Sequence, residues 1–252
     1  MADPLLALSG ISRSFGGLKA VQNVSLAVRE GSLSALIGPN GAGKTTLFAL
    51  MSGFLKPDTG TVRFAGQDIT GREPHRNALL GLTRTFQIVK PFAAQTVREN
   101  IAVGAHLHVR SRREALSRAE QVAARVGLAP QLDKPASDLT VAGRKRLELA
   151  RALATQPRLL LLDEVLAGLN PSEIRDMVPV IRAIRGRGVT IVMIEHVMQA
   201  VISLAENVFV LSEGRVIAEG LPDAIAADPH VVEAYLGRGA AGRMTATGSA
   251  HA

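Results

Sequence analysis

The chain has 252 residues, enough to bury a core as one α/β domain with a subdomain or as two small domains. Its net charge of +7 suits an anionic ligand, a nucleic acid or a lipid surface without choosing among them, whereas only 3% aromatic residues argues against base stacking on single strands. The absence of cysteine excludes disulfides and thiolate chemistry. No signal peptide and no apolar run of ~18 residues is visible, so we expect a soluble chain that meets a membrane only through a partner.

Strands dominate the first 70 residues. The stretches "VSLAVREG" and "GTVRFAG" alternate apolar and polar side chains, which predicts strands with one buried face. Between them "LSALIG" is a short apolar run that ends in glycine, as in a buried strand that leads into a loop. A helix is predicted over residues 44–54, stopping near Gly53.

From about residue 91 to 155 the composition shifts to Arg, Ala, Leu and Glu, which predicts an inserted helical subdomain. The densest basic run of the chain, "VRSRREALSR" at 109–118, lies in this segment. It is interpreted either as a solvated helix face or as a patch for an anionic partner.

The sheet resumes after this segment. "RLLLLDE" (158–164) and "GVTIVMIEH" (188–196) predict buried strands, and "VFVLSEGRVIAEG" (208–220) predicts a hairpin. Between the two strands, Asn170 as N-cap, Pro171 at the first position and Glu173 predict a helix start. The buried stripe of that helix is predicted to consist of Ile174, Met177, Val178, Ile181 and Ile184. The segment 237–252 is rich in Gly, Ala and Thr and is predicted to be a disordered tail.

Residues 38–45, "GPNGAGKT", match the phosphate-loop pattern GxxxxGK[ST] between a predicted strand and a predicted helix. Glycines at 41 and 43 would let backbone N–H groups wrap a β-phosphate at the helix N-terminus. Lys44 would reach the β- and γ-phosphate oxygens, and Thr45 would ligate Mg²⁺. The competing interpretation is a glycine-rich turn with a chance Lys-Thr pair.

Four further residues become candidates once this loop is taken as a phosphate site. Asp163 and Glu164 end a buried strand, where unpaired charge is costly, and so suit a magnesium-holding carboxylate followed by one that polarises water. The alternative for them is an acidic pair that starts a helix. His196 also ends a buried strand, at the edge where ligands bind in open parallel sheets, although a lone histidine is often structural. Gln87 is suggested by its position alone.

The order of these motifs resembles that of the ATP-binding subunits of ABC transporters, over about residues 5–236. The matching pieces are Phe15 in "SRSFGG", "GPNGAGKT", Gln87, "LLLLDE", "AGLNP" and His196. Within that class the chain is most similar to the branched-chain amino-acid importer group, through "RTFQIVKPF", "LELARALATQP", "IEHVM" and the ending "VVEAYLG". The resemblance implies a phosphate-loop, RecA-like α/β core with an antiparallel β subdomain and the helical subdomain at about 91–155.

The resemblance also implies roles for individual residues. Phe15 would stack on adenine, His196 would contact the γ-phosphate and Glu164 would act as the base. Thr45, Gln87 and Asp163 would arrange Mg²⁺. The implied nucleotide contacts are Phe15, Gly38, Pro39, Asn40, Gly41, Ala42, Gly43, Lys44, Thr45 and Thr46, together with Thr140, Val141, Ala142 and Gly143 in the partner's site.

Thr140 to Gly143 belong to "LTVAG", which occupies the place of the family's LSGGQ turn. Thr140 keeps the hydroxyl, whereas Val141 and Ala142 replace two glycines. A positive φ at Val141 would cost about 1–3 kcal/mol, whereas a negative φ would leave the backbone donors intact. Both alternatives are open from sequence. Asn170 also departs from the usual aspartate at its position.

The predicted function is ATP hydrolysis that powers an importer for branched-chain or related amino acids, with ATP and Mg²⁺ bound. Implied partners are a second ATPase chain of the same or a similar kind, transmembrane permease subunits and, indirectly, a periplasmic solute-binding protein. The expected location is the cytoplasmic face of the cell membrane, and no nucleic-acid partner is expected. Alternatives are an ABC ATPase of a lipid or lipopolysaccharide system, a non-transport ABC ATPase acting on DNA or ribosomes, and a metabolic kinase. The last lacks a substrate domain.

Overall fold

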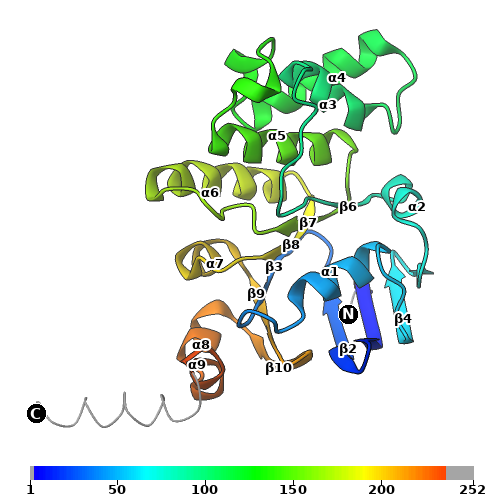
Figure 1. The fold of residues 1–252 in the computed structure, drawn as a ribbon, viewed down its shortest axis with the longest axis vertical. Helices are drawn as coiled ribbons and strands as arrows, with labels where there is room; N and C mark the ends of the chain where they lie inside the picture. The colour runs from blue at the N-terminus through cyan, green and yellow to red at the C-terminus, as the bar shows by residue number, and fades with distance from the viewer. Residues whose placement is uncertain (1–2, 237–252) are drawn as a thin grey trace, which may run out of the picture.

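Two β-sheets and a group of helices make up the computed structural model, which describes residues 3–236 (Figure 1). The first sheet is antiparallel, with the strand order β2-β1-β4-β5. Its strands are β1 (Leu6–Phe15), β2 (Leu18–Val28), β4 (Thr59–Phe64) and β5 (Gln67–Asp68). The predicted alternation is confirmed, since Val24, Leu26 and Val28 are buried on one face of β2.

The second sheet has the order β10-β9-β3-β8-β7-β6. Its parallel strands are β3 (Leu33–Ile37), β6 (Leu82–Arg84), β7 (Leu159–Asp163), β8 (Thr190–Ile194) and β9 (Asn207–Ser212). The predicted hairpin is formed by β9 and the antiparallel β10 (Arg215–Gly220). β3, β7 and β8 are buried along their whole length, and apolar residues make up most of each strand. Their carboxyl ends meet at one edge of the sheet.

Alternate residues of the parallel strands face two different cores. On one side, Leu159 and Leu161 pack with helix α1 (Lys44–Ser52) and with the inner face of the antiparallel sheet. On the other side, Leu160 and Leu162 pack with helices that come after α1 in the chain. α1 therefore lies between the two sheets, and Gly53 ends it in a left-handed conformation as predicted.

The helices α3 (Val97–Ala105), α4 (Arg112–Arg125) and α5 (Val141–Ala154) pack on one another at one end of the molecule, at the top of Figure 1. They are the helices predicted for the inserted segment. Thr96 caps α3 in a reciprocal arrangement with Glu99, and the short turns Ala129–Gln131 and Ala136–Asp138 connect α4 to α5. Most of the basic run at 109–118 is exposed on α4.

The remaining helices are α2 (Pro74–Leu79), α6 (Pro171–Gly186), α7 (Met198–Leu204), α8 (Pro222–Ala227) and α9 (Pro229–Leu236). Asn170 and Glu173 form the predicted capping box of α6. Met177, Ile181 and Ile184 are buried, and Ile174 and Val178 pack against the same core. The predicted disordered tail, 237–252, lies outside the described residues. Within residues 3–236, no helix has the length and apolar character needed to cross a membrane.

Candidate functional site: a phosphate loop and its carboxylates

The loop between β3 and α1 has a conformation that only glycine allows at two positions. Gly43 has a φ of 100°, and a Cβ there would lie 2.3 Å from the carbonyl oxygen of Ala20. A Cβ on Gly38 would lie 2.0 Å from the carbonyl oxygen of Leu211. At these two glycines the loop therefore lies directly against β2 and β9. α1 begins directly after Gly43, and no side chain caps it. Its first N–H groups are therefore available to an anion.

Lys44, the first residue of α1, holds its ammonium inside this loop. Its Nζ donates to the carbonyl oxygens of Gly38 at 2.7 Å and Pro39 at 2.9 Å. Burial lowers the pKa of Lys44, and the nearby carboxylates of Glu164 and Asp163 oppose that shift. The loop thus brings a positive charge and free N–H groups to the same place.

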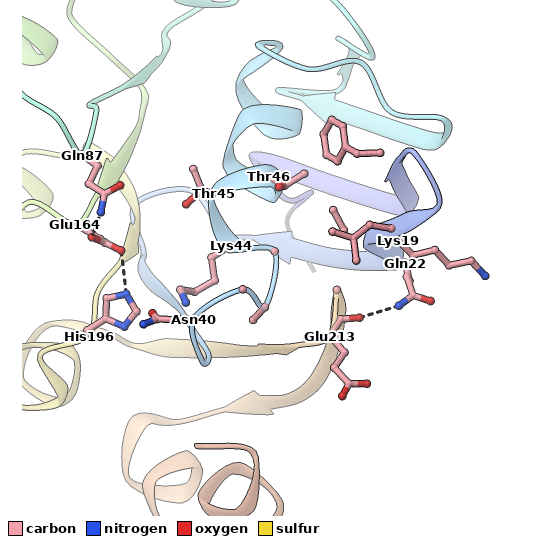
Figure 2. A pocket seen from close by; sticks show the side chains of 17 residues that line it. Lys19, Gln22, Asn40, Lys44, Thr45, Thr46, Gln87, Glu164, His196 and Glu213 are labelled. Atoms are coloured by element: carbon pink, nitrogen blue, oxygen red, sulfur yellow. Dashed lines mark hydrogen bonds and ion pairs between the residues drawn. The ribbon is translucent and has the colours of Figure 1, made fainter. Parts of the chain in front are cut away.

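A cavity of about 690 Å³ opens over the loop and joins segments that are far apart in the sequence (Figure 2). Of the residues identified from sequence, it is lined by Phe15, Asn40, Gly41, Ala42, Gly43, Lys44, Thr45, Thr46, Gln87, Glu164 and His196. Figure 2 shows Gln87 and His196 on either side of Glu164, with Lys44 between this group and Lys19. The cavity volume is in the range of small-molecule sites.

Glu164 lies at the centre of the polar contacts. Its Oε2 accepts a hydrogen bond from Gln87 Nε2 at 2.6 Å, and its Oε1 lies 2.9 Å from His196 Nε2. Its backbone has a φ of 50°, a left-handed conformation that is uncommon for a residue other than glycine. Backbone strain of this kind is concentrated at functional sites, because the surrounding contacts must hold it. The carboxylate is thus fixed in place from two sides while it faces the cavity.

Asp163, one residue earlier, is buried and paired. Its Oδ2 accepts from Arg84 at 2.6 Å, and the Arg84 guanidinium lies 5.5–6.0 Å from the ring centres of Phe48, Phe54 and Phe86. Its Oδ1 is buried without a hydrogen-bond partner. With Thr45 and Gln87, Asp163 lines a neighbouring cavity of about 540 Å³. Arg84 was assigned no role from sequence, although it is the first residue of "RTFQIVKPF", and it ends the short strand β6.

The unpartnered Oδ1 of Asp163 is the feature that suits a cation. Mg²⁺ is usually held by one or two carboxylates together with substrate phosphates and water, rather than by a cage of protein ligands. The Thr45 hydroxyl, the Gln87 amide and Asp163 line one cavity and fit this ion.

The opposite end of the cavity is built by the β1–β2 hairpin and the β9–β10 turn. Phe15 is 43% exposed there, and the Arg13 guanidinium lies 5.1 Å from the centre of its ring. The other lining residues at this end were assigned no role in nucleotide binding from sequence. They are Leu18, Lys19, Ala20, Gln22, Glu213 and Gly214.

The turn at Thr140 to Gly143 lines neither of these two cavities. Thr140 caps α5, its Oγ1 accepting from Gly143 N at 3.1 Å, and Val141 is the first helical residue. Val141 and Ala142 are not among the described non-glycine residues with positive φ. Of the two alternatives left open by the sequence, the structure supports a negative φ at Val141. Replacing two glycines therefore costs this turn no backbone strain.

An ammonium, a helix N-terminus and a fixed carboxylate around one cavity, with a second carboxylate in the neighbouring cavity, suit the hydrolysis of a nucleoside triphosphate, which places the protein among the phosphate-loop NTPases. Two family profiles narrow this class. Residues 21–167 match "ABC transporter", and residues 215–241 match "Branched-chain amino acid ATP-binding cassette transporter". The chain belongs to the ABC transporter family, as one of its ATP-hydrolysing subunits.

Individual relatives are similar over nearly their whole length. The chain is 40% identical over 253 aligned positions to the high-affinity branched-chain amino acid transport ATP-binding protein LivG of Salmonella typhimurium, covering 94% of this chain and 99% of the relative. The same values hold for BraF of Pseudomonas aeruginosa, which has the same description. Among solved structures, the ADP conformation of MJ1267, an ATP-binding cassette of an ABC transporter, matches with a TM-score of 0.85 and 32% identity. That alignment covers 94% of this chain and 100% of MJ1267. The fold class predicted from sequence is confirmed.

Proposed function

We propose that the protein hydrolyses ATP to power an importer of branched-chain or related amino acids. The proposal is supported by the names of the relatives LivG and BraF and by the match of residues 215–241 to the branched-chain group. Residues 5–236 would form one ABC ATPase domain, with the helical subdomain at about 91–155. The partners would be permease subunits and, through them, a periplasmic solute-binding protein. The chain would then lie at the cytoplasmic face of the cell membrane.

The observation that carries the catalytic proposal is the position of Glu164 between Gln87 and His196. A carboxylate that is fixed on both sides and faces the phosphate loop is suited to orient and deprotonate a water molecule. Lys44 would leave the carbonyl oxygens of Gly38 and Pro39 to bind the β- and γ-phosphates. His196 would contact the γ-phosphate, and the backbone of residues 38–46 would bind the remaining phosphate oxygens.

Thr45, Gln87 and Asp163 are the residues that would hold Mg²⁺. When bound, this ion neutralises charge on the phosphate oxygens. Because Arg84 occupies Asp163 Oδ2, only Oδ1 is left to serve the ion or one of its water ligands. The remaining nucleotide contact of this chain would be Phe15, which stacks on the adenine ring.

A second ATPase chain would complete the site. Thr140, Val141, Ala142 and Gly143 line neither cavity of their own chain, and they lie at the N-terminus of α5. In a head-to-tail pair, this end of α5 would present the Thr140 hydroxyl and backbone N–H groups to the γ-phosphate of the partner's ATP.

The test uses Glu164→Gln, which removes the base and keeps the size of the side chain. We expect ATP hydrolysis to fall by at least about 100-fold while ATP binding persists. Light scattering with ATP and Mg²⁺ would then show a stable dimer if the chain pairs with itself. A monomer that binds ATP would point to a different, heteromeric partner. Undiminished hydrolysis in the variant would contradict the role of Glu164.

A further inference from the structure

Lys145 has a buried ammonium that the proposed chemistry does not use. It lies on α5, five residues after the Thr140 N-cap, and only 8% of the residue is exposed. Its Nζ donates to the carbonyl oxygen of Glu164 at 3.0 Å and to that of Gln87 at 3.3 Å. A buried ammonium is costly unless such acceptors surround it, so these contacts are expected to hold the lysine firmly.

The two acceptors belong to the residues whose side chains meet over the phosphate loop. Gln87 Nε2 donates to Glu164 Oε2, so the two segments are joined twice: by this side-chain bond and through Lys145. Gln87 lies in an irregular segment, and Glu164 directly follows β7. A change in the distance between these segments would therefore move the lysine or break one of its bonds.

Lys145 belongs to a row of side chains along one face of α5. Lys145, Glu148 and Arg151 are three residues apart, the spacing that brings side chains to the same side of a helix. Arg151 donates to the carbonyl oxygen of Lys90 at 3.2 Å and to Glu148 at 3.1 Å. Lys145 and Arg151 thus both bind the main chain of residues 87–90. Of these two, Lys145 also binds Glu164.

The N-terminus of the same helix carries the Thr140–Gly143 turn. An α-helix is stiff over one turn, so a displacement at Lys145 reaches Thr140 with little loss. We propose that Lys145 is a positioning residue that transmits a change at the nucleotide site of its own chain to the turn that faces the partner's site. The inference rests on the proposed function, because it needs ATP to bind over Lys44 and the turn to face a partner.

The experiment follows amide hydrogen exchange in the full-length Glu164→Gln protein with and without ATP and Mg²⁺. Three further variants are made in that background: Lys145→Met, Lys145→Arg and the control Arg146→Met. Arg146 is the next residue on the helix and carries the same charge. Its guanidinium donates to the carbonyl oxygen of Val126, within the helical group, and not to residues 86–90 or Glu164.

We expect ATP to slow exchange at residues 38–46 in every variant, with affinities within about twofold of one another, since Lys145 does not touch the nucleotide cavity. The response at residues 139–146 should be present in the parent, in Lys145→Arg and in Arg146→Met. In Lys145→Met it should be reduced at least fivefold. A merely structural lysine would instead change exchange at 139–146 equally with and without ATP.

Each other outcome has one meaning. A full response at 139–146 in Lys145→Met, or no response there in the parent, would overturn the inference and leave the ATPase proposal intact. Equal loss of the response in Arg146→Met would also overturn it, because the effect would then come from weakening α5 in general. Failure of the parent to bind ATP would overturn the proposed function itself.

Discussion

At the scale of single residues, Arg84 and Asp163 form the most buried ion pair among the described residues. The Arg84 side chain is 7% exposed and that of Asp163 is 2% exposed. Removing one partner leaves a buried charge without its counter-ion, which typically costs 3–5 kcal/mol. The pair therefore ties β6 to β7 next to the phosphate loop.

We expect Arg84→Met to lower the free energy of unfolding by about 3–5 kcal/mol. The matched control is Arg158→Met. Arg158 pairs with Glu30 at 2.8 Å, but those side chains are 49% and 58% exposed, so its loss should cost about 1 kcal/mol or less. Urea denaturation of both variants measures the difference. Equal losses of unfolding free energy in the two variants would contradict the view that the buried Asp163 carboxylate needs Arg84 as its counter-ion.

Glu195 is a second buried carboxylate and directly precedes His196 in the sequence. It is 1% exposed, and its Oε1 accepts from Leu166 N at 2.9 Å. Burial raises the pKa of Glu195 to about 7, an effect that hydrogen bonds from the Leu166 and His196 backbone oppose. The folded protein thus keeps a proton on Glu195 at pH values where the unfolded chain has already lost it.

This difference predicts that stability falls as pH rises. Between about pH 4.5 and 7 the native state binds more protons than the unfolded state, so the free energy of unfolding decreases, by about 3 kcal/mol in total for this group. Glu195→Gln keeps an oxygen that accepts from Leu166 and does not titrate. We expect this variant to lose much less unfolding free energy than the parent between pH 5 and 8, as measured by urea denaturation. The same decline in parent and variant would contradict this assignment.

At the scale of elements, α3 and α5 approach each other at Gly104. A Cβ there would lie 2.3 Å from the carbonyl oxygen of Arg151. In an open helix position, replacing glycine by alanine raises helix propensity by about 1 kcal/mol. At Gly104 the backbone of α5 occupies the space, so the two helices would have to separate.

We therefore expect Gly104→Ala to destabilise the protein by about 1–3 kcal/mol. Gly186→Ala is the control, because Gly186 ends α6 and a Cβ there meets nothing within 4 Å. It should be neutral or stabilising by up to about 1 kcal/mol. Thermal unfolding of the two variants compares them directly. A gain of stability in Gly104→Ala would show that the helices can separate at no cost.

Elements with local signals were predicted well from sequence. The capping residues Asn170 and Glu173 and the apolar run of β7 each act within a few residues of themselves, and the glycines of the phosphate loop belong to a contiguous motif. The contacts that complete the site could not be predicted in this way. Arg84 and Asp163 are 79 residues apart, and Gln22 and Glu213 are 191 residues apart. Such pairs become neighbours only when the sheets assemble, and nothing in the sequence around one partner indicates the other.

At the scale of the whole molecule, ATP should stabilise the fold, because the cavity joins segments from both sheets. For the Glu164→Gln protein at an ATP concentration 100 times the Kd, the expected gain is about 2.7 kcal/mol. This corresponds to a rise in Tm of about 5–10 °C for a chain of this size. Thermal unfolding with ATP, ADP and AMP measures it. Lys44→Met, which lacks the ammonium, should show a much smaller rise with ATP, and an equal rise would contradict the phosphate site.

The turn between β9 and β10 fixes the two ends of the cavity relative to each other. Gly214 N donates to the Ala42 carbonyl oxygen at 2.9 Å, and Gln22 N donates to the Gly214 carbonyl oxygen at 2.7 Å. Main-chain bonds thus set the separation between the hairpin at Phe15 and the phosphate loop. Under the proposed function, this separation would correspond to the distance from adenine to the β-phosphate, which is the same in ATP and ADP. Gln87, Glu164 and His196 would then be the residues that distinguish ATP from ADP, so that the γ-phosphate alone would trigger the conformational change.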